Sequence, residues 1–248
     1  MKLKPVLQLA TVSLGLLLSG ASNAWNEAGG EKDEAMTLQA DKQRGIAVYE
    51  VCSACHLLEG WGLKDGTFPQ LAGQHRNVLI KQMADIRAGN RDNPTMYPFA
   101  LDDQIMGAAG YKKGDIKPAQ LVADVTDYIA KLPMNPDWGK GPWGKDSPEY
   151  KLGEKLYKDN CVQCHGENGE GSNEKFYPKI HGQHYKYMLR QFEWIRDGKR
   201  RNANPDMVKQ IKTFSDKDMQ AVVNYVVLLP VPKDKMAPSK DWLNPDYD

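Results

Sequence analysis

Apolar residues in the first half of the chain recur at the spacing of helices. One helix is expected to begin near Asp41 and to end at Cys52, and a second should follow His75. A third ends at Leu132-Pro133. The positions expected to be buried in these helices are Ile46, Tyr49, Val51, Val78, Leu79, Met83, Leu121, Val125, Tyr128 and Ile129.

The second half repeats this pattern. Its helices are expected from Glu149 to Cys161, after His184, and up to Leu229-Pro230. Ser215 supplies an N-cap for the last of them. The expected buried positions are Tyr157, Tyr187, Met188, Phe192, Ile195, Met219, Val222, Val223, Tyr225 and Val226.

A constant offset of 109 residues relates the two halves. The run Pro69-Gln70-Leu71-Ala72-Gly73-Gln74-His75 corresponds to Pro178-Lys179-Ile180-His181-Gly182-Gln183-His184, and Gln82 corresponds to Gln191. Such self-similarity indicates a duplicated structural unit. Each copy also has a glycine four residues before a tyrosine, at Gly45 and Gly153, which would allow a second helix to approach closely.

The duplication divides the chain into two domains, 41–133 and 149–231. Residues 134–148 between them are rich in Pro and Gly, which indicates a linker, and Trp138 and Trp143 are expected to pin it to a surface. The tail 232–248 has a similar composition and should also wrap along the domains. Residues 25–40 are expected to form a flexible leader.

The first 24 residues have the features of a signal peptide. Two lysines precede a 14-residue apolar run, which is shorter than the roughly 20 residues of a membrane-spanning helix. Small residues then offer a cleavage site after Ala24. We therefore expect an exported protein located in the periplasm.

All four cysteines lie in two Cys-x-x-Cys-His motifs. This motif is typical of c-type haem attachment, in which two thiols add to the haem vinyl groups and the histidine binds iron. The residues are Cys52, Cys55 and His56 in the first copy, and Cys161, Cys164 and His165 in the second. The sequence therefore predicts two covalently attached haem c groups.

The second axial ligand of each iron should lie well downstream of the histidine. A methionine there raises the reduction potential and leaves no open position, which suits electron transfer. Met207 is the candidate for the second haem, because Met188 and Met219 occupy core helix positions. For the first haem Met96 is preferred over Met106, because Met96 shares the Pro-x-Met setting of Met207.

Other histidines are rivals for the axial position. His75 and His184 follow Gly-Gln at the start of a helix, where a hydrogen-bonded histidine near the surface or the domain interface is the simpler interpretation. His181 has no counterpart in the first copy and is interpreted as incidental.

The first copy departs from the second in two places. Leu57-Leu58 follows the haem histidine, whereas Gly166 follows it in the second copy. About 14 extra residues lie between Tyr97 and Lys117, beyond Met96. A surface for a specialised partner is expected at these differences.

The charge balance argues against nucleic acid as a partner. Without Lys2 and Lys4 the chain has 31 basic and 32 acidic side chains, so no basic field exists. The second domain is the more cationic, with 14 basic and 11 acidic groups. Its cluster Lys199-Arg200-Arg201 is either a solvated loop or a patch that steers an acidic partner.

Together these motifs resemble the dihaem cytochrome c4 family, which has tandem class I cytochrome c domains. The resemblance covers about residues 41–231, including the Gly-x-x-x-Tyr helix, Cys-x-x-Cys-His, Pro-x-Leu-Ala-Gly-Gln and the Gly-x-Arg segments at 89–91 and 198–200. It implies an all-α fold of two domains, each wrapped around one haem and related by a pseudo-twofold axis. It also implies that the carbonyls of Pro69 and Pro178 accept hydrogen bonds from His56 and His165, and that the haem propionates approach each other.

The expected function is that of a periplasmic electron carrier without catalytic residues. Its donor would be a quinol-oxidising complex or a periplasmic dehydrogenase, and its acceptor a terminal oxidase or reductase, so that any contact with the membrane is through partners. The alternatives are a peroxidase-like dihaem enzyme, for which His75 would be the acid/base group, and a permanently docked subunit of a larger redox complex.

Overall fold

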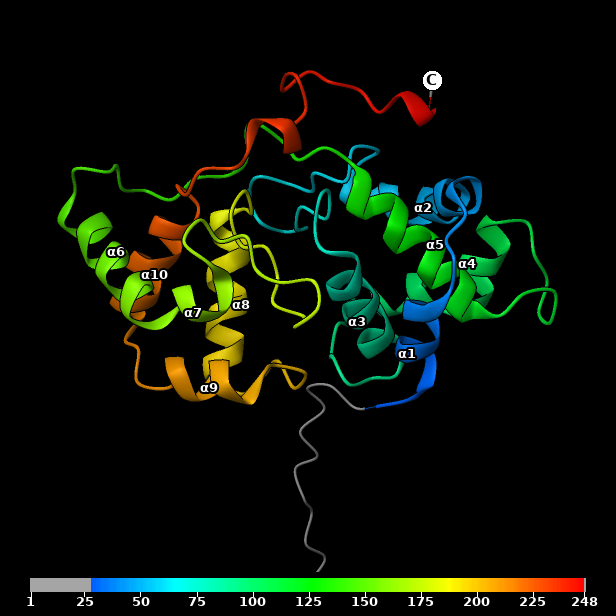
Figure 1. The fold of residues 1–248 in the computed structure, drawn as a ribbon, viewed down its shortest axis with the longest axis horizontal. Helices are drawn as coiled ribbons and strands as arrows, with labels where there is room; N and C mark the ends of the chain where they lie inside the picture. Colours follow the sequence, from blue (N-terminus) through cyan, green and yellow to red (C-terminus); the bar gives the residue numbers. More distant parts are fainter. Residues whose placement is uncertain (1–27, 248) are drawn as a thin grey trace, which may run out of the picture.

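The computed structural model describes residues 28–247, which form two helical units side by side (Figure 1). The signal peptide and its cleavage after Ala24 lie outside these residues. Every helix between residues 28 and 247 is too short or too polar to cross a membrane. The N-terminal unit contains α1 (Gly30–Thr37), α2 (Lys42–His56), α3 (Arg76–Arg87), the 3₁₀ helix η1 (Tyr97–Ala100), α4 (Asp102–Ala108) and α5 (Pro118–Lys131).

The C-terminal unit has the same plan with fewer elements. It contains α6 (Pro148–Asn160), α7 (Val162–His165), α8 (Tyr185–Arg196), α9 (Pro205–Ile211) and α10 (Asp216–Val226). Two 3₁₀ turns, η2 (Lys233–Lys235) and η3 (Pro245–Tyr247), belong to the tail. Each unit has its own buried apolar cluster, so the two halves fold around separate cores.

The helix ends follow the local sequence. Asp41 caps α2 by accepting a hydrogen bond from the Arg44 N–H, and Ser215 forms a full capping box with Asp218 at α10. Gly89 and Gly198 directly follow the last residues of α3 and α8 and have φ of 76° and 72°, a conformation that favours glycine. The predicted caps and stops are therefore confirmed.

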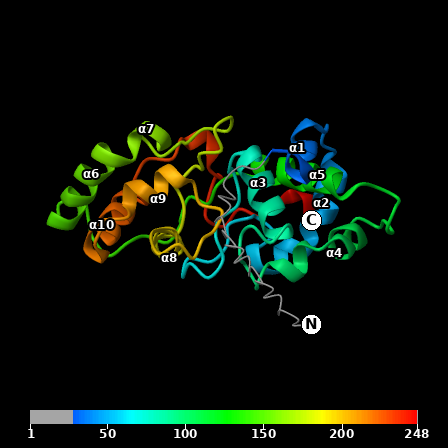
Figure 2. The ribbon, with the colours of Figure 1, turned by 90° about the horizontal axis from the view of Figure 1, so that it is seen from below.

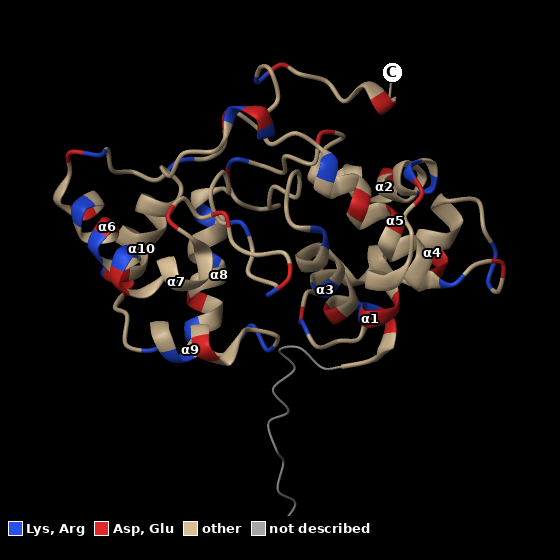
Figure 3. Ribbon diagram, viewed as in Figure 1, with Lys and Arg blue, Asp and Glu red and all other residues tan. Residues whose placement is uncertain are grey.

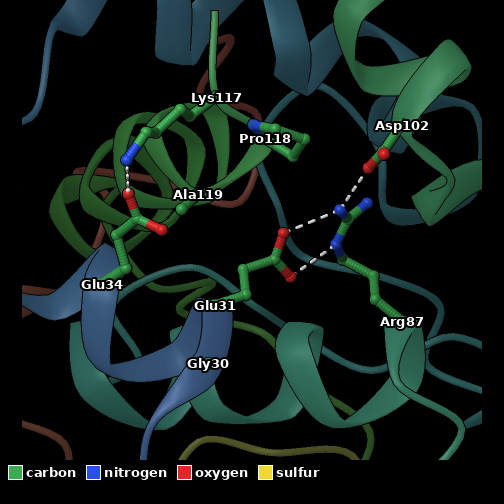
Figure 4. Close-up of a pocket in the computed structure, with 8 residues that line it drawn as sticks. All are labelled: Gly30, Glu31, Glu34, Arg87, Asp102, Lys117, Pro118 and Ala119. Atoms are coloured by element: carbon green, nitrogen blue, oxygen red, sulfur yellow. Dashed lines mark hydrogen bonds and ion pairs between the residues drawn. The ribbon is translucent and has the colours of Figure 1, made fainter.

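The expected flexible leader is wrong for residues 30–37, which form α1. This helix packs on α3 and α5, and Ala35 is fully buried between them. Glu31 makes a two-point ion pair with Arg87, which also binds Asp102, while Glu34 binds Lys117 across the same shallow pocket (Figure 4). The acidic composition that suggested mobility instead supplies partners for cations on the unit behind it.

The linker is fixed along the C-terminal unit, as predicted. The Trp138 indole is buried and donates to the Val227 carbonyl over 2.8 Å. The backbone N–H and carbonyl of Trp143 both bind the side chain of Asn224 on α10. Met134, at the start of the linker, is held between Gly73 and Gly182, where any β-carbon would collide with its side chain.

The C-terminal tail leaves the C-terminal unit and crosses back to the N-terminal unit, where it lies over α2 and α5 (Figures 1 and 2). Asn244 donates to the Leu58 carbonyl and to the Tyr128 hydroxyl over 2.7 and 2.8 Å. The Tyr247 hydroxyl donates to the Ile46 carbonyl, and Trp242 lies against Trp61 with ring centroids 5.9 Å apart. The expected wrapping of the tail is confirmed, and it straps one unit with residues from beyond the other.

Candidate haem sites

The first Cys-x-x-Cys-His motif occupies the last turn of α2. Cys52 and Cys55 are three residues apart and therefore lie on one side of the helix, and His56 is its final residue. His56 is buried, with its Nδ1 atom 3.0 Å from the Pro69 carbonyl oxygen. A carbonyl can only accept, so Nδ1 carries the proton and Nε2 has the lone pair that an iron atom needs.

The second motif has the same geometry on a slightly different backbone. Cys161 breaks the helix between α6 and α7, and His165 ends α7. The Nδ1 atom of His165 is 3.1 Å from the Pro178 carbonyl oxygen. Both proline carbonyls thus stand where the family resemblance implies.

The protonation states of both motifs suit covalent haem attachment. Burial lowers the pKa of His56 and of His165, and the bonds to the proline carbonyls only partly oppose this effect, so both rings stay neutral. Burial raises the pKa of Cys52 and of Cys161 to about 12. Before attachment these side chains are therefore thiols, whereas a thiolate metal site would need a lowered pKa.

A tyrosine fixes the turn that follows each haem histidine. The Tyr49 hydroxyl donates to the Leu57 carbonyl over 2.8 Å, and the Tyr157 hydroxyl donates to the Gly166 carbonyl over 2.6 Å. The two turns have nearly the same backbone, with φ of 65° at Leu57 and 77° at Gly166. The N-terminal unit therefore holds a leucine in a conformation that favours glycine.

The candidate axial methionines occupy different kinds of position. Met96 precedes η1 and is partly exposed, whereas Met106 lies in α4 with only 3% of its surface exposed, in the apolar core. Met207 was expected in a loop but lies in the first turn of α9, a helix started by Asn204 and Pro205. Met219 is fully buried in the core of the C-terminal unit.

His75 and His184 connect the two units, which confirms their interpretation as hydrogen-bonded helix-start residues at the interface. His75 Nε2 donates to the Glu170 carbonyl over 2.8 Å, and His184 Nε2 donates to the Trp61 carbonyl over 2.7 Å. These two bonds are equivalent under the offset of 109 residues, so they are related by the duplication.

The glutamines of the repeated motif make a second pair of reciprocal bonds. Gln183 accepts from the Gln70 N–H and donates to the Gln70 carbonyl over 2.9 and 2.8 Å. Gln74 does the same with the backbone of Lys179, over 2.8 and 2.9 Å. The interface therefore has pseudo-twofold symmetry, with each unit offering the same groups to the other.

A cluster of two arginines lies on the same symmetric interface. Arg91 binds Gln82 of its own unit and Gln191 of the other, and Arg200 binds Gln191 and Gln82 in the mirrored way. Burial and the nearby Arg91 charge lower the pKa of Arg200, so the pair lacks sufficient negative charge. Carboxylates of bound haem would provide that charge, which is a second respect in which the chain fits two haem groups.

This arrangement corrects both interpretations of the cationic cluster in the second domain. Arg200 takes part in the arginine cluster, and Arg201 donates to the Gly89 carbonyl over 2.8 Å, so both are committed to the N-terminal unit. Only Lys199 of the three is exposed. The equal spacing of Gln82 and Arg91 with Gln191 and Arg200 was the sequence signal for this contact.

Comparisons with known proteins agree with this geometry. The family described as Cytochrome c matches residues 42–133 and 150–230. The chain is 30% identical to cytochrome c4 from Stutzerimonas stutzeri over 75% of its own length and 88% of that protein. It is also 30% identical to the thiosulfate dehydrogenase electron acceptor of Stutzerimonas stutzeri strain A1501, over 77% of this chain and 88% of that one.

A solved structure resembles the whole two-unit arrangement. The crystal structure of reduced recombinant cytochrome c4 from Pseudomonas stutzeri superposes with a TM-score of 0.59 at 28% identity. The match covers 77% of this chain and all of the other.

Proposed function

The chain belongs to the cytochrome c family and is a dihaem electron-transfer cytochrome of the cytochrome c4 type, and from this premise we propose that it carries electrons in the periplasm with a His/Met pair on each iron. The single observation that carries the proposal is the pair of neutral, carbonyl-anchored histidines at the ends of α2 and α7. Each bound haem supplies a one-electron ferric/ferrous couple.

The protein's own residues hold the two couples in place. The Pro69 and Pro178 carbonyls fix the rings of His56 and His165 and increase their basicity, which tunes the iron without taking part in a reaction. Tyr49 and Tyr157 hold the chain immediately after each histidine. Electron transfer benefits from such rigidity because little has to rearrange when the charge on the iron changes.

Met96 and Met207 are the proposed second ligands. Met106 is already used in the core beside Ile105, whereas Met96 lies outside the core in a Pro-x-Met segment like that of Met207. His75 cannot serve as the acid/base group of a peroxidase-like site without breaking its bond to the other unit. This favours the carrier over the enzyme.

The proposed partners follow from the relatives and from the signal peptide. One relative is named as the electron acceptor of thiosulfate dehydrogenase, so a periplasmic dehydrogenase of that kind is a reasonable donor for this chain. A terminal oxidase or reductase is the proposed acceptor.

Near-infrared absorption of the ferric protein tests the ligand assignment. Two iron–thioether bands of equal strength are expected, and Met96→Ala and Met207→Ala should each remove one of them. Met106→Ala is the matched control: it should keep both bands and cost about 2–5 kcal/mol of stability as a core truncation. If Met106→Ala removes a band while Met96→Ala leaves both, the assignment at the first haem is wrong.

A further inference from the structure

We propose that Leu57, Leu58 and Leu243 form a docking surface on the N-terminal unit for an electron-transfer protein whose own contact face is apolar and rimmed by Lys or Arg. We call these three residues the leucine surface. The proposal rests on the proposed carrier function and names the kind of partner that would be bound beside the first haem site. It is argued from backbone strain, from the way the tail is anchored and from the surrounding charge.

Leu57 is strained without being needed in the core. Its φ of 65° and ψ of 161° lie in a region used almost only by glycine, which costs a leucine about 1–3 kcal/mol. Its side chain is 39% exposed, so burial does not offset the cost. Gly166 occupies the equivalent position in the C-terminal unit and avoids the cost entirely. The leucine is therefore retained at a cost to folding, which points to a use outside folding.

The tail brings a third exposed leucine to the same place. The Asn244 side chain donates to the Leu58 carbonyl over 2.7 Å, so residue 243 lies next to the Leu57-Leu58 turn. Both neighbours of Leu243 are anchored, because Asn244 is only 3% exposed and Trp242 lies against Trp61. Leu243 itself is 70% exposed. A side chain fixed on both sides and still directed to solvent is held in a conformation ready to bind.

The charges around the leucine surface are mainly acidic. Glu50 and Glu59 flank the turn, and no ion pair involves either of them among residues 28–247. Asp241 and Asp246 lie on the tail, with Lys240 and Lys42 as their neighbours, and Figure 3 shows red at the end of the tail. Four carboxylates against two ammonium groups favour a partner with a cationic rim.

The same charges argue against a membrane as the occupant. Anionic lipid attracts Lys and Arg, and an acidic rim would be repelled from such a surface. Three leucines with an acidic rim instead have the composition of a protein interface, with an apolar centre and a polar edge.

The test measures electron transfer from the reduced, haem-loaded protein to two oxidants. The first is a lysine-rimmed single-haem cytochrome c, used as a probe for the proposed partner class, and the second is ferricyanide, which is too small to need a docking surface. Leu57→Gly and Leu243→Ser should each lower the bimolecular rate constant for the basic probe about tenfold and leave the ferricyanide rate unchanged. The wild-type rate for the basic probe should fall as salt is added.

Folding and docking are separated by the same variants. Leu57→Gly should be at least as stable as the wild type because it relieves the strain, so a loss of rate cannot be attributed to unfolding. Leu101→Ser is the matched control, because Leu101 is 40% exposed but lies at the start of α4. It should leave both rates unchanged.

Unchanged rates for the basic probe in both leucine variants would overturn the proposal. So would Leu243-dependent binding to vesicles of phosphatidylcholine and phosphatidylglycerol, which would identify a lipid surface as the occupant. Failure to reduce either oxidant would instead contradict the proposed carrier function.

Discussion

His184 shows how one uncharged ring can join three parts of the chain. Its Nε2 donates to the Trp61 carbonyl of the N-terminal unit, and its Nδ1 accepts from the Gly139 N–H of the linker over 3.0 Å. Both bonds exist together only when the imidazole is neutral, since protonation of Nδ1 turns an acceptor into a donor facing a donor. Burial lowers the pKa of His184 accordingly.

The stability of the haem-loaded protein should therefore depend on pH through this residue. Because the folded state has the lower pKa, the unfolded chain takes up the proton first, and the free energy of unfolding falls as pH drops below about 6.5. The slope should reach at most about 1.4 kcal/mol per pH unit for one proton. Denaturant unfolding between pH 7.5 and 5 should show a smaller slope in His184→Gln, which can still donate to Trp61.

His75→Gln provides the comparison for this prediction. His75 makes the equivalent bond to Glu170 but is more exposed, so its replacement should change the slope less. Equal slopes in the wild type and in His184→Gln would contradict the role given to His184.

At the scale of elements, each unit is organised around one close helix crossing. Gly45 of α2 faces α5, where an added β-carbon would lie 2.6 Å from the Asp124 carbonyl oxygen. Gly153 of α6 faces α10, where an added β-carbon would overlap the Ala221 carbonyl oxygen. These crossings set the distance between the helix that carries or leads to the haem motif and the helix that closes the unit.

Gly153→Ala should consequently destabilise the C-terminal unit although alanine is the better helix former. Overpacking at this contact should cost about 1–3 kcal/mol, measured as the free energy of unfolding in guanidinium chloride. Gly107→Ala is the matched control, because Gly107 is also helical but has open space around it. It should stabilise by about 0.5–1 kcal/mol. A Gly153→Ala variant as stable as the wild type would show that the helices can separate freely.

Much of the fold and the sites could be predicted because the chain states them twice. Repetition at a fixed offset identified the haem motifs, the glycine crossings and the helix ends. The helix at residues 30–37 was missed because its apolar face is small, and its stability comes from ion pairs such as Glu31 with Arg87 that only the fold brings together. The strain at Leu57 was also hidden, since a backbone angle is not visible in a residue type. The spatial neighbours of the tail depend on a chain reversal that local patterns do not encode.

At the scale of the whole molecule, the tail makes the stability of the N-terminal unit depend on residues beyond the C-terminal unit. Ala237, Trp242 and Tyr247 join the apolar cluster of α2 and α5. The C-terminal unit has no comparable strap among residues 28–247, since the linker alone covers it. The first haem site is therefore held by more of the chain than the second.

Ending the chain at Met236 should loosen one unit selectively. The loss of the bonds from Asn244 and Tyr247 should speed hydrogen exchange of the slowest α2 amides at least about tenfold, which corresponds to about 1.4 kcal/mol. Amides of α6 and α10 should exchange at unchanged rates. Equal acceleration in both units would mean that the tail stabilises the molecule as a whole.

The reciprocal bonds of Gln74 with Lys179 and of Gln183 with Gln70 have a consequence for assembly. An interface in which both sides offer the same groups is isologous, the kind that joins identical subunits into a closed pair. Covalent duplication has placed such a pair within one chain, so its self-complementary surface is already occupied. The molecule has thereby closed its own twofold contact, and the same surface cannot recruit further copies into an open polymer.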